Sequence, residues 1–355
     1  MLAFIVFLFC VVSVRAQAPD QLTIGSVTSR PGEKVSGFVE VPPATDVGTQ
    51  IPITIVQGRK PGPVLLLMAG VHGSEYAPIV ALQRVRARVQ PELLSGTLIL
   101  VQVANIPSFL KRTIYYGPVD GKNLNRMFPG KADGSITERI AYVLTEQVFR
   151  KADYVIDIHC GDANEALIPY VAYYTEHSDP SLVEKSKAMA MAFGIQYVKA
   201  ISGRSKDFNT AVYSTNASFL LGKPTMAVES GELAKTDEAS ISTIERGVFN
   251  ILRHLQMLPG TPAKQGTRLI VTRDETIRST TTGIFYPLVN RGRRVRQGEL
   301  IGYVTDFFGK RIQEAKAPFT GIVLYITATP PINAGEPVAS VGQLEAKPTR
   351  VSRRE

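Results

Sequence analysis

Apolar residues form two different patterns along the middle of the chain. Between residues 62 and 258, short apolar runs bounded by polar loops alternate with longer segments whose apolar positions recur every three or four residues. The first pattern is typical of buried strands and the second of amphipathic helices. We expect strands at 63–70, 97–105, 153–159, 195–200 and 224–231, and helices at 76–89, 136–150, 181–193 and 241–258. This alternation predicts an α/β fold, with helices flanking a mixed, mostly parallel sheet.

Both flanks of this region are richer in β-type sequence. Residues 20–57 form a short β-rich lead-in, and residues 265–345 contain short β-type runs punctuated by glycines. The second stretch is similar to a lipoyl- or biotinyl-type hammerhead, so we expect a C-terminal β-rich, hammerhead or barrel-like domain. A carrier domain of that type presents a modified lysine at a hairpin tip, whereas the corresponding stretch here reads TDFFGK without a matching lysine context. We therefore expect a structural or substrate-gating cap.

The first residues, MLAFIVFLFCVVSVRAQA, read as a secretory signal peptide at 1–18. The apolar stretch ends in small residues and is short for a membrane span, although an uncleaved anchor is the alternative. We expect a periplasmic or secreted protein made of a domain at 19–260, the β-rich domain at 265–345 and a basic tail at 346–355. Its remaining cysteine, Cys160, would have no internal disulfide partner.

Composition and charge limit the kinds of molecule that the protein is expected to bind. With 355 residues and 44% hydrophobic content, the chain can bury one sizeable core and a satellite domain. The formal charge of +9 favours anionic substrates or surfaces. Because the basic residues are dispersed and no base-stacking motif accompanies them, we expect no nucleic-acid partner. No later segment is apolar enough to predict stable membrane insertion, and the oligomeric state is not predicted.

The clearest candidate chemistry lies at two predicted strand ends. His72 and Glu75 stand three residues apart just after the apolar run PVLLLMAG, and His159 closes the run ADYVIDIH. Two imidazoles and one carboxylate form the donor set of a catalytic zinc site with an open fourth position. The alternative interpretation makes His72 a loop residue and His159 a hydrogen-bonded core histidine. The chain has only four histidines, and the strand-end position of these two favours the metal site.

Four segments in order, GVHGSEYAP, VDGKNLNRMFPG, DIHCGD and TMAVESGE, resemble the succinylglutamate desuccinylase/aspartoacylase family of M14-type zinc carboxypeptidase-like hydrolases. The resemblance runs from about residue 50 to residue 345. It implies one zinc ion per chain, a pair of side chains for the substrate carboxylate and a glutamate acid/base. The implied residues are His72, Glu75 and His159 for zinc, Asn125 and Arg126 for the carboxylate, and Glu229 for proton transfer.

The substrate-binding candidates also have a physical interpretation. Arg126 belongs to a long loop without helical or strand periodicity, and its planar guanidinium matches a carboxylate through two parallel hydrogen bonds. Asn125 would add a neutral donor, although both residues could instead only tie the loop down. Arg112 is a candidate for polarising the scissile carbonyl. Its spacing departs from the shorter form usual in the family, and a surface arginine is the alternative.

Two carboxylates follow the run PTMAV. Glu229 ends that predicted strand, where partial desolvation would raise its pKa toward the range useful for acid/base catalysis. Glu232 is the rival, with helix capping as its alternative role. Asp157 shares a strand face with His159, so it could orient that imidazole or only balance local charge. Cys160 should point the other way and is interpreted as a packing residue.

These observations predict a secreted zinc-dependent amidohydrolase. Its substrate would be an N-acyl amino acid or a small peptide-like carboxylate, cleaved at the amide by activated water. A carboxypeptidase acting on peptides or cell-wall stem peptides is the closest alternative within the same fold. A non-catalytic zinc- or ligand-binding protein is the alternative from another class.

Overall fold

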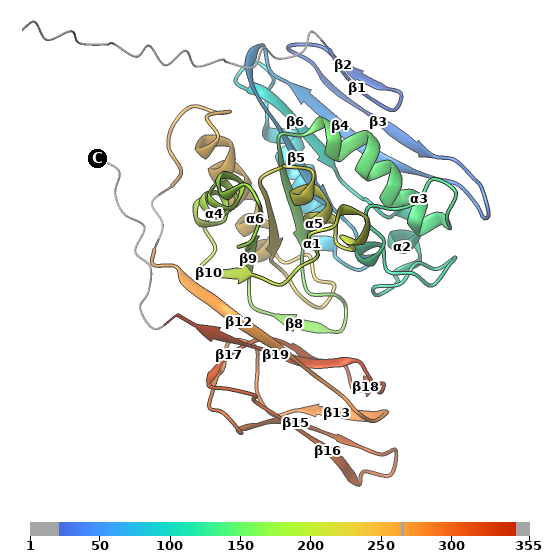
Figure 1. The fold of residues 1–355 in the computed structure, drawn as a ribbon, viewed down its shortest axis with the longest axis vertical. Coiled ribbons are helices and arrows are strands. Elements are labelled where there is room, and N and C mark those ends of the chain that lie inside the picture. Colours follow the sequence, from blue (N-terminus) through green and yellow to red (C-terminus); the bar gives the residue numbers. More distant parts are fainter. Residues whose placement is uncertain (1–20, 264–265, 346–355) are drawn as a thin grey trace, which may run out of the picture.

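The computed structural model describes residues 21–263 and 266–345, so the expected signal peptide and basic tail lie outside the described residues. Most of this part of the chain surrounds one long mixed sheet, and a smaller β-rich domain lies at one end of it (Figure 1). The α/β architecture and the C-terminal β-rich domain are therefore confirmed.

Strands of the α/β region pair in the order β12-β10-β9-β11-β7-β5-β6-β4-β3. Their bounds are β3 (Lys34–Val41), β4 (Thr49–Gln57), β5 (Lys60–Ala69), β6 (Ser95–Val101), β7 (Tyr154–His159), β9 (Tyr170–Tyr174), β10 (Tyr197–Ile201), β11 (Thr225–Glu229) and β12 (Leu269–Arg278). A separate hairpin of β1 (Leu22–Ile24) and β2 (Val27–Ser29) precedes them. Each strand expected from the apolar runs thus overlaps an observed one.

Helices cover both faces of this sheet because its central strands are apolar on both sides. Along β5, Leu65 and Leu67 face one hydrophobic core, whereas Leu66 and Met68 face the other. The main helices are α1 (Tyr76–Arg88), α2 (Ile106–Lys111), α3 (Ile136–Val143), α4 (Pro180–Phe193), α5 (Ser214–Leu220) and α6 (Glu238–His254). Helices α1, α4 and α6 pack on the first core, and α3 packs on the second. The expected helix at 136–150 continues past α3 as a π turn and a 3-10 turn.

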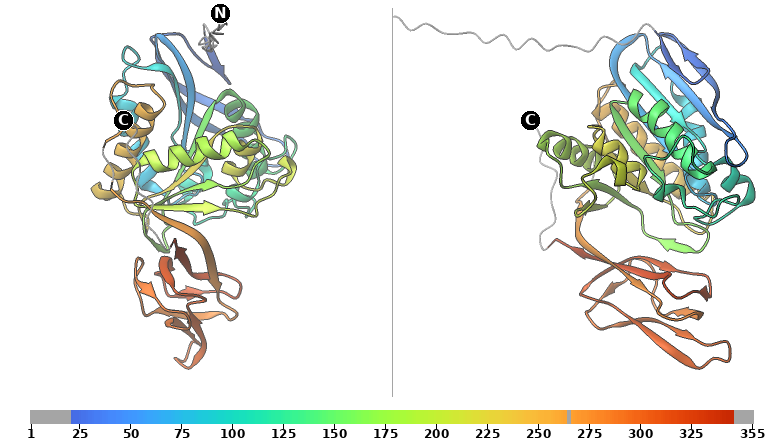
Figure 2. Two further views of the ribbon diagram at one scale, coloured as in Figure 1. Left: turned by 60° about the vertical axis from the view of Figure 1, so that its left-hand side comes forward. Right: turned by 45° about the vertical axis from the view of Figure 1, so that its right-hand side comes forward.

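The C-terminal domain is a sandwich of two sheets around its own core. One layer continues the long sheet beyond β12, and the other has the order β16-β15-β13-β18. The bounds are β13 (Gly283–Pro287), β14 (Arg294–Val295), β15 (Leu300–Thr305), β16 (Arg311–Lys316), β17 (Gly321–Thr327), β18 (Pro331–Ile332) and β19 (Pro337–Leu344). Figure 2 shows this domain as a distinct lobe below the α/β region. A short strand of the α/β region, β8 (Glu165–Leu167), pairs with β17 and ties the lobe to it.

The long sheet is mixed, and the expectation of mostly parallel strands holds within the α/β region, where five of the eight pairs from β12 to β3 are parallel. Parallel pairs occur only between β12 and β6, and even there β9 and β11 run antiparallel. The strands of the C-terminal domain join through antiparallel pairs, as do β3 and β4 at the opposite edge. Apolar periodicity identifies strands but carries no information about their direction, because direction depends on pairing between distant segments.

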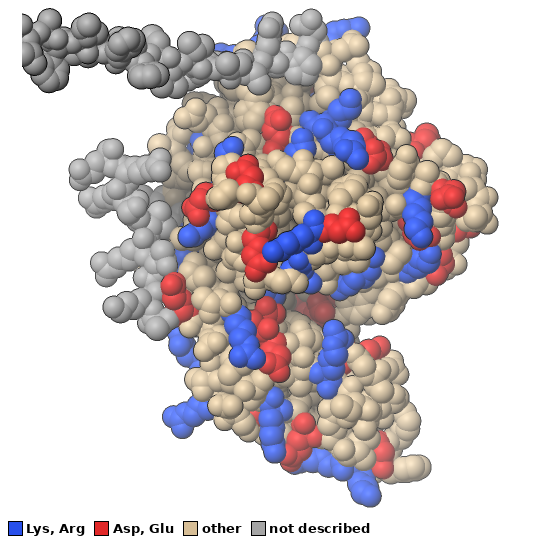
Figure 3. Space-filling view, in the orientation of Figure 1, with Lys and Arg blue, Asp and Glu red and all other residues tan. Residues whose placement is uncertain are grey.

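On the face drawn in Figure 3, basic and acidic side chains are interspersed over both regions of the molecule. Among the described residues, no helix is both long and apolar enough to cross a membrane.

Candidate active site

Three neighbouring strand ends position the candidate donor residues. Strands β5, β7 and β11 lie side by side and run parallel, with Ala69 opposite Ile158 and Glu229 opposite His159. His72 and Glu75 lie in the turn that connects β5 to α1, and His159 is the last residue of β7. The carboxyl ends of parallel strands open onto one edge of a sheet, which is where ligands bind in α/β folds.

The structure brings these three side chains into contact. One ligand atom from each of His72, Glu75 and His159 lies within 4.8 Å of the other two. His72 Nδ1 is 2.7 Å from Glu75 Oε1, and His159 Nδ1 is 2.9 Å from Glu75 Oε2. All three residues are at least nine-tenths buried. They therefore form a compact pocket of two imidazole nitrogens and a carboxylate, here called the donor set.

Asp157 holds the far side of the His159 ring. Its Oδ2 lies 2.9 Å from His159 Nε2, and it also accepts a hydrogen bond from the Ser214 hydroxyl at the start of α5. Asp157 is fully buried, and its Oδ1 has no partner among the described residues. With Nε2–H directed at the carboxylate, Nδ1 presents its lone pair to the donor set. A second carboxylate behind a ligating histidine is a recurrent feature of metal centres.

An equivalent arrangement supports His72. Its Nε2 lies 3.2 Å from Asn123 Oδ1, so Nδ1 is again the nitrogen that faces Glu75. Asp162 Oδ2 is 3.1 Å from the same Nδ1, and the Ser74 hydroxyl donates to Asp162 Oδ1 at 2.6 Å. Both imidazoles are thus oriented with Nδ1 toward Glu75, as a metal ion bound by all three residues would require.

The electrostatics of the donor set fit a cation. Burial raises the pKa of Glu75, but the two nearby imidazoles outweigh it and hold this pKa at about 2. Burial lowers the pKa values of His72 and His159, yet the surrounding carboxylates raise both well above the usual value. In the absence of a metal, protons on the rings balance the buried negative charge. Two nitrogens and one carboxylate oxygen suit zinc, which would replace those protons.

Glu229 ends β11 directly beside His159 and is not part of the donor set. Burial raises the pKa of Glu229 to about 8, because the lowering by His159 is opposed by the carboxylates of Glu75 and Glu165. A carboxyl group with this pKa exchanges protons near neutral pH, as an acid/base group must. A divalent cation in the donor set would favour the ionised form and lower this value.

The Asn125–Arg126 pair is linked to Asp157 through Ser214. The two residues belong to a 3-10 turn at Leu124–Arg126, a short helical turn where the sequence indicated an irregular loop. Asn125 Oδ1 accepts a hydrogen bond of 3.1 Å from the Ser214 amide, so the turn contacts the same serine as Asp157. The exposed Arg126 guanidinium lies 4.6 Å from the centre of the Tyr213 ring. It forms no ion pair with any described carboxylate, so it is available to a ligand.

The other two candidate residues, Arg112 and Glu232, do not contact the donor set among the described residues. Arg112 ends α2 in a left-handed conformation with an exposed side chain, and no side-chain bond to the donor set is present among the described residues. Glu232 accepts hydrogen bonds from Arg291 of the C-terminal domain and from the Leu167 amide. The capping role considered for Glu232 is wrong, because Asp237 caps α6 through the Ser240 amide.

Sequence reasoning did not single out Asn123, Asp162, Tyr115 or Glu165. Asn123 and Asp162 lie inside the motifs VDGKNLNRMFPG and DIHCGD. Both have side-chain oxygens near His72, so a search of these motifs for residues that can accept a hydrogen bond from a histidine could have identified them. The Tyr115 ring packs edge-on to His72, with 5.8 Å between ring centres, and the Tyr115 hydroxyl donates to Glu165 Oε1 at 2.8 Å. No local sequence signal indicates that tyrosine–glutamate contact.

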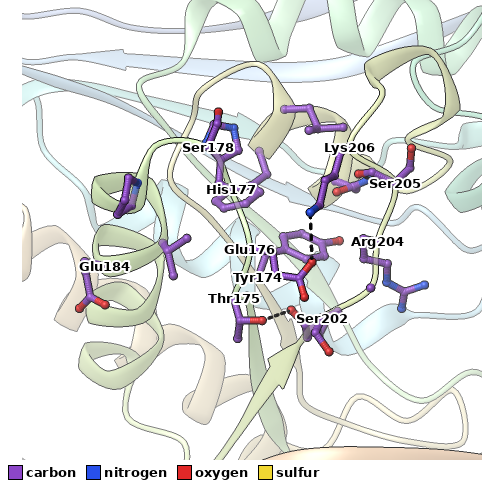
Figure 4. Close-up of a pocket in the computed structure, with 17 residues that line it drawn as sticks. Tyr174, Thr175, Glu176, His177, Ser178, Glu184, Ser202, Arg204, Ser205 and Lys206 are labelled. Atoms are coloured by element: carbon purple, nitrogen blue, oxygen red, sulfur yellow. Dashed lines mark hydrogen bonds and ion pairs between the residues drawn. The ribbon is translucent and has the colours of Figure 1, made fainter.

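A cavity of about 780 Å³ opens between the ends of β9 and β10 and helices α4 and α5 (Figure 4). Lys206 and Glu176 form a 3.9 Å ion pair on its wall. Arg204, which lines the cavity, lies 4.3 Å from the Tyr213 ring centre, so the same ring contacts both Arg204 and Arg126. No donor-set residue lines the cavity, which is therefore distinct from the candidate metal centre.

Comparisons with known proteins agree with this architecture. Residues 61–255 match the succinylglutamate desuccinylase/aspartoacylase catalytic domain. The chain is 31% identical over 322 residues to N-alpha-acetyl-L-2,4-diaminobutyric acid deacetylase from Halomonas elongata, and the match covers 87% of this chain and 91% of that protein.

Solved structures give the same result over nearly the whole length. The product-bound ectoine utilization protein EutE (DoeB) from Ruegeria pomeroyi has a TM-score of 0.79 at 27% identity, covering 89% of this chain and 96% of that one. A succinylglutamate desuccinylase/aspartoacylase from Rhodobacter sphaeroides has a TM-score of 0.78 at 25% identity, covering 90% and 97%. The chain belongs to the succinylglutamate desuccinylase/aspartoacylase family.

Proposed function

We propose that this protein is a zinc-dependent amidohydrolase that removes the acyl group from N-acyl amino acids. The observation that carries the proposal is the buried donor set, in which each imidazole presents Nδ1 while an oxygen acceptor holds its Nε2. The family consists of deacylase-type hydrolases, and the relative from Halomonas elongata is named as a deacetylase of an N-acetylated amino acid. Both findings support cleavage of an amide bond.

His72, Glu75 and His159 would hold the zinc ion. When bound there, zinc supplies Lewis acidity that activates water and polarises the amide carbonyl. The protein's own contribution is to keep the three ligands buried and correctly oriented. Asp157 and Asn123 perform that task through the far nitrogen of each ring.

Glu229 would move the proton. One of its carboxylate oxygens accepts a proton from the attacking water and then delivers it to the amine nitrogen as the carbon–nitrogen bond breaks. Two observations support this role: Glu229 is paired with His159 in the strand register, and burial raises the pKa of its carboxyl group to about 8 in the metal-free site, a value that bound zinc would lower toward the ionised form. A group that must accept and release one proton in each cycle works best when its pKa lies near the operating pH.

Asn125 and Arg126 would bind the carboxylate of the substrate amino acid. The guanidinium is exposed, is packed on Tyr213 and lacks an acidic partner in the described ranges. A bidentate contact with a carboxylate would position the amide for attack. The signal-peptide pattern at 1–18 further supports the proposal that the enzyme is exported to the periplasm or secreted.

The test combines metal analysis with a matched pair of variants. Purified protein should contain about one zinc per chain and should hydrolyse N-acyl amino acids, with small peptides included to detect a carboxypeptidase of the M14 type. Glu229→Gln should abolish turnover while retaining zinc, whereas Glu232→Gln, the same change three residues away, should retain turnover. Zinc binding without hydrolysis of any compound in the panel would contradict the proposal and favour a non-catalytic binding protein.

A further inference from the structure

Glu165 carries a carboxyl group close to the donor set. The reaction proposed above assigns this carboxyl group no role. It is the first residue of β8, and its Oε1 accepts a 2.8 Å hydrogen bond from the Tyr115 hydroxyl. The same tyrosine packs edge-on to His72, so Glu165 lies one side chain away from the donor set. No lysine, arginine or histidine in the described part of the chain forms an ion pair with Glu165.

Two distant segments fix this carboxyl group in place. Strand β8 pairs with β17 of the C-terminal domain, with Glu165 opposite Thr327 (Figure 1). The Leu233 amide, in the loop after β11, donates to the Glu165 backbone carbonyl at 3.2 Å. Asn164, in the turn just before β8, places its side-chain oxygen 3.0 Å from the same Tyr115 hydroxyl, whose one proton is shared between the two acceptors. Two oxygen acceptors therefore lie together at the start of β8.

The surroundings favour a positively charged ligand. Burial raises the pKa of Glu165 to about 7, with a further increase from Asp162 and a smaller lowering by the Tyr115 hydrogen bond. Glu165 nevertheless keeps a minor part of its surface exposed and is not sealed in the core. Desolvating a carboxylate without a cation is unfavourable, and a cation that reaches Glu165 would relieve that penalty.

We propose that Glu165, held by Tyr115, binds an ammonium group of the substrate. This proposal rests on the proposed deacylase function and extends it to substrate selection. An ammonium group is a compact donor of three hydrogen bonds, which matches the acceptors of Glu165 and Asn164. The ammonium could come from either side of the amide: the side chain of the amino acid, or the acyl group of an aminoacyl compound.

Two pairs of nearly isosteric ligands distinguish these sources. Nα-acetyl-2,4-diaminobutyrate and Nα-acetylnorvaline differ by an ammonium on the amino-acid side. Glycylnorvaline and propionylnorvaline differ by an ammonium on the acyl side. Dissociation constants would be measured by calorimetry on the zinc-loaded Glu229→Gln protein, in which turnover is blocked. The ammonium member of one pair should bind about 10- to 100-fold more tightly, the range expected for a charged hydrogen bond.

Adding Glu165→Gln should remove that preference and leave the uncharged ligand unaffected. Glu176→Gln is the matched control, since Glu176 pairs with Lys206 at a different cavity, and it should retain the preference. Equal binding within both pairs overturns the proposal without any change at Glu165. A preference that survives Glu165→Gln in a protein with unchanged melting temperature also overturns it. Turnover of N-acyl amino acids by the unaltered enzyme tests the proposed function separately, because the binding preference is measured without turnover.

Discussion

Replacing Asp157 with asparagine should weaken zinc binding while preserving the fold. The carboxylate accepts hydrogen bonds from His159 Nε2 and from the Ser214 hydroxyl on a single oxygen, and it is completely buried. Asparagine has nearly the same shape and retains one oxygen acceptor, but it removes the negative charge that makes the imidazole a stronger ligand. Loss of such a supporting carboxylate typically lowers metal affinity about 10- to 100-fold.

That range corresponds to about 1.4–2.7 kcal/mol of binding free energy. The lower part of the range applies if the amide oxygen keeps both hydrogen bonds. The upper part applies if the amide rotates, because its NH₂ group would then face Ser214 and the ring would lose its acceptor. Asp157 Oδ1 has no hydrogen-bond partner in the described part of the chain.

Zinc affinity would be measured by competition with a chromophoric chelator, on protein whose folding is checked by circular dichroism. Asp153→Asn is the matched control, because Asp153 is an exposed aspartate just before the same strand, and its carboxylate accepts a hydrogen bond from the Val64 amide. An unchanged zinc affinity in Asp157→Asn would refute the claim that Asp157 supports a ligating histidine. It would also weaken the assignment of His159 Nδ1 as a metal ligand.

Three further predictions concern substrate binding, pH and packing. Arg126→Ala should raise KM for carboxylate substrates about 10- to 100-fold, whereas Arg150→Ala, another arginine over an aromatic ring, should not; equal KM values would exclude Arg126 from the site. In metal-free protein, folding raises the pKa values of the two donor-set imidazoles and of Glu229, so the stability that their protonation contributes should fall as pH rises. The loss runs from about 4.5 to about 8 for Glu229 and begins near 6.5 for the imidazoles, so both losses overlap between about 6.5 and 8. Saturating zinc should reverse this trend in denaturant titrations, because metal binding displaces those protons; a rise in metal-free stability over this interval would contradict the charge assignment. Gly247→Ala should lower stability by about 1–3 kcal/mol despite the better helix propensity of alanine, because a Cβ at this position of α6 would overlap the buried Phe193 ring; an unchanged melting temperature would show that α4 and α6 can separate freely.

The C-terminal domain is more closely connected to the candidate site than the sequence indicated. A structural or substrate-gating cap was expected, and in the structure β12 and β19 continue the central sheet into this domain while β17 pairs with β8. Arg291 from the same domain contacts Glu232, three residues after Glu229. Main-chain pairing and an ion pair therefore join the C-terminal domain to segments that adjoin the candidate site.

Local features of the sequence were sufficient for the family, the α/β class and the C-terminal β-rich domain, all of which are confirmed. They also identified the donor set, which the structure brings together. These features could be predicted because each depends on residues that are close in the sequence. Apolar runs define the strands, and the histidine and glutamate residues of the site follow at the ends of those runs. His72 and Glu75 share one turn, and His159 ends a strand whose apolar pattern is unambiguous.

Only the tertiary structure decided how these local features act on one another. Strand direction, the contact of Asn123 with His72 and the placement of Glu165 against β17 all depend on pairing between segments far apart in the chain. The shifted pKa values of Glu229 and Glu165 likewise arise from burial and from neighbouring charges supplied by several strands. Sequence fixes which groups can ionise or bind metal. The fold sets their solvation and their distances, and these determine what the groups do.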